Sequence, residues 1–258
     1  MQQKKSLGQH FLIDKNISAK IVRTAHITPS DVVWEIGPGK GILTEQLLEK
    51  CKKLLVFEID SCWADFIAKK FSNPKLQIIN QDILKVNFSQ YYENSPVKIV
   101  SNIPYQITSP LLLKIADNNE LFSSITLMVQ DEVAERVVGI PGTKSYGRLS
   151  IKIQYYFQVE KLFRVPPHLF RPKPRITSAV IRLLPRQNPP EIPDETLLWS
   201  LIDYTFQHRR KMLRNSLKNF IDPKTYQDVV CSSDFDFTRR PEELSIEDFI
   251  FLTKQIKK

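Results

Sequence analysis

A glycine-rich turn constrains the fold of this chain more than any other sequence feature. The apolar run at 31–36 predicts a strand, residues 37–41 carry three glycines in a G-x-G-x-G spacing, and residues 42–51 predict a helix. Glycines at such a turn let the backbone approach a ligand closely, and the helix N-terminus offers free N–H groups. Because position 42 is Ile, the turn lacks the third glycine of the dinucleotide G-x-G-x-x-G pattern. The spacing therefore favours a cofactor that has no pyrophosphate.

Strand-like and helix-like segments alternate up to residue 185. Further strands are predicted at 53–59, 76–80, 97–100 and 125–130, and further helices at 16–26, 61–71, 107–116, 131–138 and 145–157. Alternating elements with short connections indicate a parallel sheet wrapped by helices. Two later runs, 158–165 and 178–184, are predicted to close this sheet as an antiparallel edge. The predicted fold class is therefore α/β, with a Rossmann-like sheet and helices on both faces.

A proline-rich stretch separates this α/β part from the rest of the chain. Residues 185–193 contain four prolines, which forbid a helix there and indicate a linker. Beyond it only helical patterns occur, at 194–208, 209–221, 223–231 and 245–256. We therefore expect a catalytic, cofactor-binding domain over residues 1–187 and a small all-helical domain over residues 188–258.

The positive charge of the chain is concentrated in one segment. The 258 residues include 37 Lys and Arg against 28 Asp and Glu, a net charge of +9. Residues 144–186 hold ten basic side chains and a single acid, a surplus equal to that of the whole chain. A second cluster comprises Arg209–Lys211, Arg214 and Lys218. A charge run is most often a solvated helix face, but clustering of this degree favours a surface that binds a polyanion.

Several classes of protein are disfavoured by what the sequence lacks. Three cysteines without a C-x-x-C spacing argue against a disulfide framework, and four histidines without a metal-type spacing argue against a metal site. No apolar run approaches the roughly 18 residues of a membrane span, and the first residues lack the apolar stretch of a signal peptide. We therefore expect a cytoplasmic protein with no metal and no membrane attachment.

Two acidic residues follow the next two predicted strands. Glu58 ends the strand at 53–59, where a carboxylate at the edge of a doubly wound sheet can accept ribose hydroxyl protons. Asp82 comes just after the strand at 76–80, where it can accept from an adenine amino group. Taken alone, each residue is better interpreted as an ordinary surface carboxylate. Together with the glycine turn they indicate a nucleoside cofactor, and the glycine spacing favours S-adenosylmethionine over NAD.

The tetrapeptide Asn102–Tyr105 follows the strand at 97–100. The asparagine amide oxygen and the next carbonyl can accept both protons of an exocyclic amino group, which aims the nitrogen lone pair at a methyl donor. Tyr105 can stack on the base. In the basic, proline-held loop at 165–175, Phe170 is predicted to form the opposite wall of a base sandwich. The alternatives are an ordinary Asn-x-Pro turn with a core tyrosine, and a core phenylalanine that anchors the loop.

These motifs, in this order, resemble the KsgA/RsmA family of small-subunit ribosomal RNA adenine N6-dimethyltransferases along the whole chain. The residues that carry the resemblance are Lys5–Leu12, Glu35–Gly41, Gln81–Ile83, Asn102–Tyr105, Phe170–Ser178, Phe206–Leu217 and Arg240–Ser245. The glycine turn alone is weakly specific, whereas the N-terminal, Asn-Ile-Pro-Tyr and Arg-Arg-Lys motifs together are strongly specific. The chain has His10 where the family often has Asn, and Ile103 where it often has Leu.

The resemblance implies a role for each matched residue. Residues expected to bind S-adenosylmethionine are His10 and Leu12 on its outer side, Gly37 at its methionine end, Glu58 at the ribose and Asp82 at the adenine, together with Glu35, Gly39, Ile59, Ile83 and Asn102. Residues expected at the reacting centre are Asn102, Pro104, Tyr105 and Phe170. Residues expected to contact RNA are Arg148, Arg171, Lys173, Arg175, Arg209, Arg210, Lys211 and Arg214.

The activity that the resemblance implies is dimethylation of N6 of two adjacent adenosines in a terminal hairpin loop near the 3′ end of 16S ribosomal RNA. The expected partner is that RNA within the small subunit or its precursor, bound by a monomer. One alternative is an adenine methyltransferase of large-subunit (23S) RNA, of the antibiotic-resistance type. Another is a ribosome-assembly factor whose methylation is dispensable. An NAD oxidoreductase is disfavoured by the missing third glycine.

Overall fold

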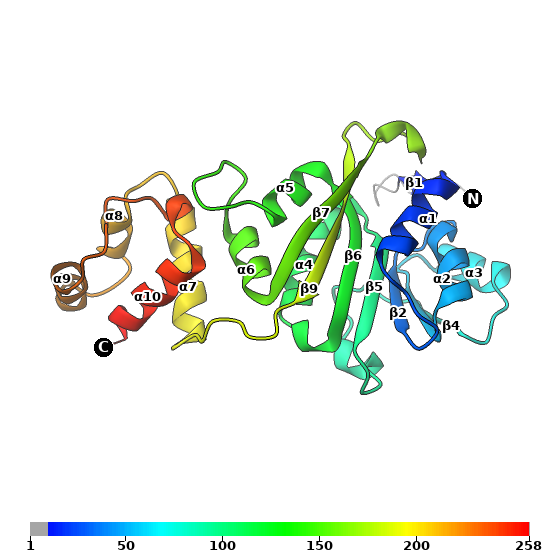
Figure 1. The fold of residues 1–258 in the computed structure, drawn as a ribbon, viewed down its shortest axis with the longest axis horizontal. Coiled ribbons are helices and arrows are strands. Elements are labelled where there is room, and N and C mark those ends of the chain that lie inside the picture. The colour runs from blue at the N-terminus through cyan, green and yellow to red at the C-terminus, as the bar shows by residue number, and fades with distance from the viewer. Residues whose placement is uncertain (1–9, 258) are drawn as a thin grey trace. The chain divides into compact units, whose positions relative to one another are not determined.

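A mixed sheet with parallel strands and an antiparallel edge forms the centre of the first part of the chain (Figure 1). The computed structural model describes residues 10–257, apart from the side chain of Ser232. The strands of the sheet are β2 (Val32–Ile36), β3 (Lys53–Phe57), β4 (Leu76–Ile79), β5 (Val97–Asn102), β6 (Phe122–Gln130), β7 (Phe157–Val165) and β9 (Ser178–Pro185). Their order across the sheet is β4-β3-β2-β5-β6-β9-β7.

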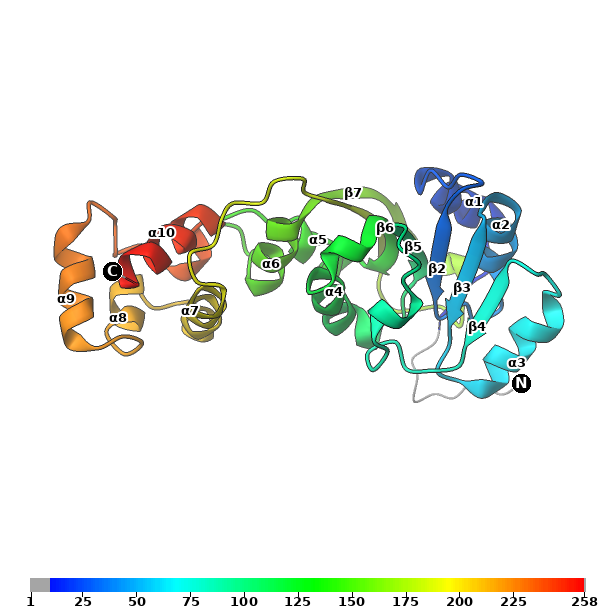
Figure 2. The ribbon, with the colours of Figure 1, turned by 90° about the horizontal axis from the view of Figure 1, so that it is seen from below.

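Strands β4, β3, β2, β5 and β6 run parallel, and Figure 2 shows β2, β3 and β4 side by side. Strand β9 pairs antiparallel with β6 on one side and with β7 on the other. The predicted antiparallel edge is therefore confirmed. All five residues of β2 are buried, which is typical of a central parallel strand covered on both faces.

The helices that accompany the parallel strands are α1 (Lys15–Thr24), α2 (Ile42–Lys50), α3 (Ser61–Lys70), α4 (Thr108–Ala116) and α5 (Asp131–Val137). Ile21 of α1 and Leu47 of α2 belong to the same buried apolar cluster as Val33 of β2. The next residue along β2 points to the opposite face, because side chains alternate along a strand. There the Trp34 ring makes an edge contact with Phe57, with 5.1 Å between the ring centroids. Apolar side chains thus fill both faces of the sheet.

A second, two-stranded sheet joins the N-terminal segment to a distant loop. It consists of β1 (Phe11–Leu12) and β8 (Phe170–Arg171), which pair antiparallel with Leu12 opposite Phe170. The sequence did not predict this pairing, because a two-residue strand has too few residues to show a periodic pattern. The pairing places the first described residues beside the proline-held loop.

The C-terminal part is helical, with α7 (Glu195–Gln207), α8 (Leu213–Leu217), α9 (Pro223–Ser232) and α10 (Ile246–Ile256). The helix predicted over 209–221 is wrong in extent, since only α8 is helical within that range. The N–H groups of Leu213 and Arg214 donate to the carbonyls of Arg239 and Phe237, at 2.8 and 3.1 Å. These bonds tie the start of α8 to a distant part of the chain. A local sequence pattern cannot predict them.

The described residues form two compact units. One contains the chain up to Glu135 together with Tyr156–Pro185, and the other contains Arg136–Tyr155 together with the residues from Arg186 onward. The linker predicted at 185–193 begins at Pro185, where the chain leaves the first unit for the last time and enters the second. Residues 136–155, which include most of α6 (Arg148–Tyr156), group with the C-terminal helices instead of the sheet. The assignment of functions to residues 1–187 and 188–258 stays a prediction.

Short 3-10 turns complete the secondary structure. They lie at Phe88–Tyr91, Tyr105–Ile107, Asn119–Leu121, Pro167–Leu169 and Pro241–Glu243. The turn at Tyr105–Ile107 leads directly from the end of β5 into α4, so it fixes the direction in which the Asn-Ile-Pro-Tyr segment leaves the sheet.

Candidate functional site

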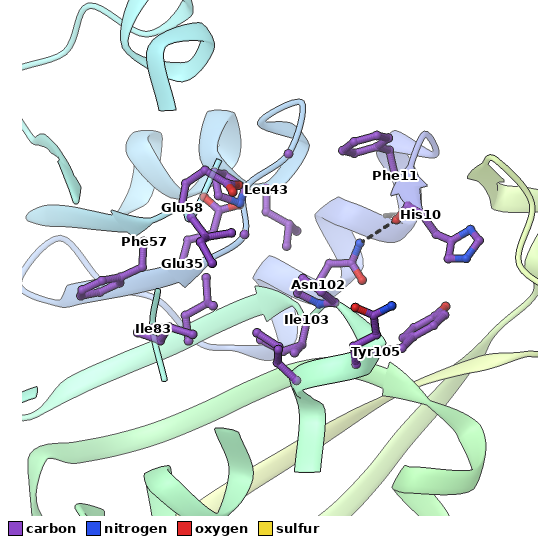
Figure 3. A pocket seen from close by; sticks show the side chains of 18 of the residues that line it. His10, Phe11, Glu35, Leu43, Phe57, Glu58, Ile83, Asn102, Ile103 and Tyr105 are labelled. Carbon is purple, nitrogen blue, oxygen red and sulfur yellow. Dashed lines mark hydrogen bonds between the residues drawn. The ribbon is translucent and has the colours of Figure 1, made fainter. Parts of the chain in front are cut away.

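A pocket opens at the carboxyl ends of the parallel strands (Figure 3). Residues 10–12, 35–40, 42–43, 57–59, 81–84 and 102–107 line it. Every residue predicted to bind S-adenosylmethionine is among them, and so are Pro104 and Tyr105. The carboxyl ends of parallel strands meet at one edge of a doubly wound sheet, which explains why such distant segments come together here.

The glycine turn forms one wall of the pocket, and its conformation requires glycine. Gly37, Gly39 and Gly41 have φ values of 66°, 54° and 78°, in the left-handed region that other residues rarely adopt. A Cβ on Gly39 would lie 2.7 Å from the ring of Phe11, so the N-terminal segment packs directly on the turn. Phe11 therefore belongs to the site. Phe11 is part of the N-terminal motif Lys5–Leu12, but the sequence analysis assigned it no role.

Glu35 places a carboxyl group in the interior beside the turn. Its side chain is 1% exposed, and its Oε2 accepts a 2.7 Å hydrogen bond from the Thr44 hydroxyl of α2. Burial raises the pKa of Glu35 to about 8; the Thr44 hydrogen bond opposes this shift and the nearby Glu58 carboxylate adds to it. Burial therefore favours the neutral form of Glu35 near pH 7.

Glu58 follows β3 and is buried at the edge of the pocket. Its Oε1 accepts from the Asp60 N–H at 2.9 Å, and the Asn80 amide donates to the Glu58 carbonyl at 2.7 Å. Burial raises the pKa of Glu58, while backbone hydrogen bonds to the carboxylate oppose the rise. The next residue, Ile59, is 55% exposed and lines the pocket. A fixed carboxylate beside an exposed apolar side chain suits a ribose and its attached base.

The loop that carries Asp82 and Ile83 is fixed by a lysine from another element. Lys114 of α4 donates to the carbonyls of Ile83, Leu84 and Val86, at 3.0, 2.8 and 2.5 Å. Asp82 in turn accepts from the Leu84 N–H at 3.0 Å. Because α4 follows directly on the Asn-Ile-Pro-Tyr segment, this lysine links the two halves of the pocket. Sequence reasoning missed it, since a lysine in a helical pattern does not reveal which carbonyls it meets.

Asn102 ends β5 inside the pocket. Its Nδ2 donates to the main-chain carbonyl of His10 at 3.4 Å, which leaves Oδ1 as a hydrogen-bond acceptor. The Ile103 N–H donates to a carbonyl of β6 at 3.2 Å, so the following peptide is anchored to the sheet. In Figure 3, Asn102 lies between the two buried carboxylates on one side and the ring of Tyr105 on the other.

The ring of Tyr105 is held at its hydroxyl end. The hydroxyl lies 2.7 Å from Oγ of Ser178, at the start of β9. Burial raises the pKa of Tyr105, so the phenol stays neutral. The imidazole of His10 stacks on the tyrosine, with 5.6 Å between ring centroids and 30° between ring planes. Residues 5–9, the rest of the quoted N-terminal motif, lie outside the described residues.

Phe170 is not among the residues that line the pocket, so its role as a wall of a base sandwich stays a prediction. The side chain is 0% exposed and belongs to the apolar cluster that contains Leu12, Val165 and Val180. The pairing of β1 with β8 covers it, because Leu12 lies directly opposite Phe170. The alternative interpretation, a core phenylalanine that anchors the proline-held loop, describes its position in this structure.

Ion pairs with acidic residues elsewhere in the chain neutralise part of the positive charge counted for residues 144–186. Lys161 and Arg164 of β7 pair with Asp131 and Glu135, which lie outside that segment. A count along the chain therefore overstates the local charge. Arg171 at the end of β8 and Lys173 and Arg175 on the loop that follows are exposed, and no ion pair within residues 10–257 involves them.

The basic residues predicted to contact RNA in the second unit fall into two groups. Arg148 pairs with Asp203 at 2.5 Å, and Arg209 pairs with Glu242 at the same distance. The others are exposed and have no ion pair in the described chain, namely Arg210, Lys211 and Arg214. The second group therefore presents positive charge to solvent most directly.

Among residues 10–257, no group of three or more His, Cys, Asp and Glu side chains is arranged to hold a metal ion. Within the same residues, no helix combines the length and apolar character that a membrane span requires.

Known proteins resemble this chain in sequence and in fold. The family model described as ribosomal RNA adenine dimethylase matches residues 1–258. Ribosomal RNA small subunit methyltransferase A of Prosthecochloris aestuarii is 42% identical over 98% of this chain and 94% of that protein. A dimethyladenosine transferase structure from Plasmodium falciparum has a TM-score of 0.78 at 27% identity, covering 94% and 96% of the two chains. The 23S rRNA methyltransferase ErmE has a TM-score of 0.73 at 25% identity, covering 96% of this chain and all of the other.

Proposed function

The chain belongs to the ribosomal RNA adenine dimethylase family, and from that premise we propose that it methylates N6 of adenosines in the RNA of the small ribosomal subunit. Family membership makes it an S-adenosylmethionine-dependent ribosomal RNA methyltransferase. The choice of the small subunit follows the printed names of relatives that match nearly its whole length.

The pocket residues fit S-adenosylmethionine chemically. The left-handed glycines provide a backbone surface without side chains, and Gly39 has no room even for a methyl group. We assign the methionine end to Gly37 with Glu35, the ribose to Glu58, and the adenine to the loop at Asp82. Opposite charge favours the ionised form of a carboxyl group, so Glu35 would complement the positive charge of a bound cofactor in its ionised form. The cofactor supplies an electrophilic methyl group on a sulfonium sulfur.

The residues around Asn102 prepare the target nitrogen. Asn102 Oδ1 and the Ile103 carbonyl accept the two protons of the adenine amino group, which directs the nitrogen lone pair toward the methyl donor. The Nδ2 bond to the His10 carbonyl keeps Oδ1 turned away from that carbonyl. Tyr105, held by Ser178, offers one stacking surface for the base. The contribution of these side chains is positioning, since a correctly held nucleophile needs no strong base before it attacks.

The finer substrate is proposed on the family resemblance. We assign two adjacent adenosines in a terminal hairpin loop near the 3′ end of 16S RNA, within the small subunit or its precursor. The protein acts in the cytoplasm as a monomer, and each base receives two methyl groups. Exposed cations on the loop after β8 and around Arg210 supply phosphate contacts.

The observation that carries the proposal is that Asn102 reaches the same pocket as the glycine turn and Glu58. The test is Asn102→Ala, assayed by labelled-methyl transfer to under-methylated small subunits and nucleoside mass spectrometry. Transfer is expected to fall at least a hundredfold while S-adenosylmethionine affinity, measured by calorimetry, changes less than about threefold. Asn119→Ala, in the 3-10 turn that follows α4, serves as the matched control and retains activity.

The same experiment separates the alternatives. Dimethyladenosine found in 23S RNA, with none in 16S RNA, would establish the large-subunit activity that ErmE has. An Asn102→Ala protein that binds small subunits and supports their normal assembly would show that methylation is dispensable for an assembly role. Full methylation by that variant would refute the assignment of Asn102 itself.

A further inference from the structure

The two central strands of the sheet, β2 and β5, stop pairing with each other before either strand ends. Within the described part of the chain, their shared register ends at Trp34 and Ile99. Strand β2 continues to Ile36 and β5 continues to Asn102. From β2 the strand order runs to β3 and β4 on one side and to β5 and β6 on the other. Such a reversal of strand order is the place where doubly wound sheets bind their ligands.

Beyond this point, each strand end stays with its other neighbour. Strand β2 pairs with β3 up to Ile36, and the Gly37 N–H then donates to the Phe57 carbonyl at 2.9 Å. Strand β5 pairs with β6 up to Asn102, and the next N–H along the chain donates to the Met128 carbonyl at 3.2 Å. The glycine turn is therefore anchored to β3, whereas Asn102 is anchored to β6.

The hydroxyl group of Ser101 connects the two strand ends. Its Oγ accepts a 2.5 Å hydrogen bond from the N–H of Ile36, 65 positions earlier in the chain. Ser101 is 0% exposed and Ile36 is 2% exposed. Because a buried N–H without an acceptor is unfavourable, this bond holds the ends of β2 and β5 at a defined separation.

Both partners of this bond immediately precede residues of the site. Ile36 is followed by Gly37, the residue assigned to the methionine end of the cofactor, and Ser101 is followed by Asn102. Gly37 and Asn102 line the pocket, whereas Ser101 is not among the lining residues. The Ser101 hydroxyl therefore lies behind the pocket wall, between the part that holds the methyl donor and the part that holds its acceptor.

On the proposed function, we propose that Ser101 is a positioning residue for methyl transfer. Its hydroxyl sets the separation between the methyl group, held at the glycine turn, and the adenine nitrogen, held by Asn102. Each part of the site keeps its own backbone bonds to β3 or β6 when the hydroxyl is removed. The loss should therefore change how the two substrates are aligned and leave the binding of each one nearly intact.

The kinetic test compares Ser101→Ala with Ser101→Thr, which keeps the hydroxyl group. Methylation of under-methylated small subunits gives kcat and KM, and calorimetry gives the affinity for S-adenosylmethionine. We expect Ser101→Ala to lower kcat by about 10- to 100-fold, because a misplacement of about 1 Å costs a reaction about a hundredfold. The subunit KM and the cofactor affinity should each change less than about threefold. Ser101→Thr should restore kcat to within about fivefold of the wild type.

A second measurement reports the hydrogen bond without any activity assay. Amide hydrogen exchange, followed by NMR, is expected to show a protected Ile36 N–H in the wild type and in Ser101→Thr. In Ser101→Ala this N–H should exchange at least about tenfold faster. Ser124→Ala is the matched control, since it makes the same substitution in β6, opposite Lys98 and outside the pocket. That variant should act like the wild type in both measurements.

Thermal unfolding of each variant verifies the fold. Wild-type kcat in Ser101→Ala would overturn the proposal, as would a loss confined to cofactor affinity or an equal loss in Ser124→Ala. A folded Thr variant as impaired as the Ala variant would also overturn it. If the Thr variant does not fold, the kcat of Ser101→Ala and the exchange of Ile36 decide together. Unchanged protection of Ile36 in Ser101→Ala would refute the bond itself. A wild-type protein that cannot methylate small subunits would instead refute the proposed function, and Ser101 would then have no reaction to position.

Discussion

The hydroxyl group of Thr44 donates a 2.7 Å hydrogen bond to the carboxyl group of Glu35, and both side chains are buried. Thr44 lies in the first turn of α2, just past the glycine turn, and Glu35 lies near the end of β2. The pair therefore joins the strand and the helix on either side of the turn. Burial dominates the balance, and the pKa of Glu35 is raised from 4.5 to about 8.

The raised pKa predicts a pH-dependent stability that Glu35→Gln removes. The folded protein keeps a proton that the unfolded chain releases above pH 4.5, so this contribution to the free energy of unfolding is present below that pH. It is lost as the pH rises toward about 8, at up to about 1.4 kcal/mol per pH unit. Urea unfolding at about pH 5.5 and about pH 8.5 should therefore show the wild type losing stability relative to the Gln variant. Parallel curves for the two proteins would contradict the burial of an ionisable group here.

Lys114→Met is expected to weaken S-adenosylmethionine binding by about 10- to 150-fold, because hydrogen bonds to a charged group contribute about 1.5–3 kcal/mol. The ammonium group holds three carbonyls of the loop that carries Asp82. Lys98→Met is the control, since Lys98 also binds a carbonyl, that of His26, and pairs with Asp31 away from the pocket. Calorimetry on both variants checks the difference. Equal affinities would show that the loop needs no anchor from α4.

Gly39→Ala should weaken cofactor binding by more than Gly142→Ala does. Both glycines have positive φ, 54° and 83°, so alanine at either site costs about 1–2 kcal/mol of stability. A Cβ at Gly142 meets nothing within 4 Å, whereas one at Gly39 would lie 2.7 Å from the Phe11 ring. The Gly39 variant therefore displaces β1 or the turn as well. Thermal unfolding and calorimetry measure the two effects separately, and a Gly39 variant with unimpaired binding would refute the packing argument.

Charge neutralisation on the loop after β8 should weaken binding to small subunits and flatten its salt dependence. Lys173→Gln or Arg175→Gln removes a cation with no ion pair among residues 10–257. Each lost phosphate contact lowers the slope of log K against log salt by about 0.7–0.9. Arg164→Gln is the control, because that side chain is exposed but paired with Asp131 and Glu135. The affinity for small subunits, measured at several salt concentrations, tests this prediction. An equal effect of all three variants would show that the loop after β8 is not the RNA-binding surface.

Local patterns were sufficient for the main sheet. Residues 31–36 and 53–59 are apolar runs of strand length, and β2 and β3 occupy nearly those ranges. The glycines at 37–41 predicted the turn, because few other residues tolerate the positive φ angles that it requires. Since carboxyl ends of parallel strands share one edge, the positions of Glu58, Asp82 and Asn102 in the pocket also followed from the order of the elements.

Long-range contacts were beyond local patterns. The pairing of Leu12 with Phe170 buries a ring that the sequence placed on the surface. In the C-terminal part, bonds from Leu213 and Arg214 to a distant segment shorten a predicted helix. The acids that neutralise Lys161 lie about thirty positions upstream, so a running count along the chain did not find them.

By itself, the sequence determined the α/β class, the alternation of strands and helices that brings acids and glycines to one edge of a parallel sheet, and the residue types that a methyl-transfer site needs. These depend on periodicity and on backbone conformation, which are local. Only the tertiary structure decided which side chains are exposed at that site. It buried Phe170, stacked His10 on Tyr105 and tied the Asp82 loop to Lys114. Exposure and partnership depend on segments that meet after folding, and no local spacing encodes them.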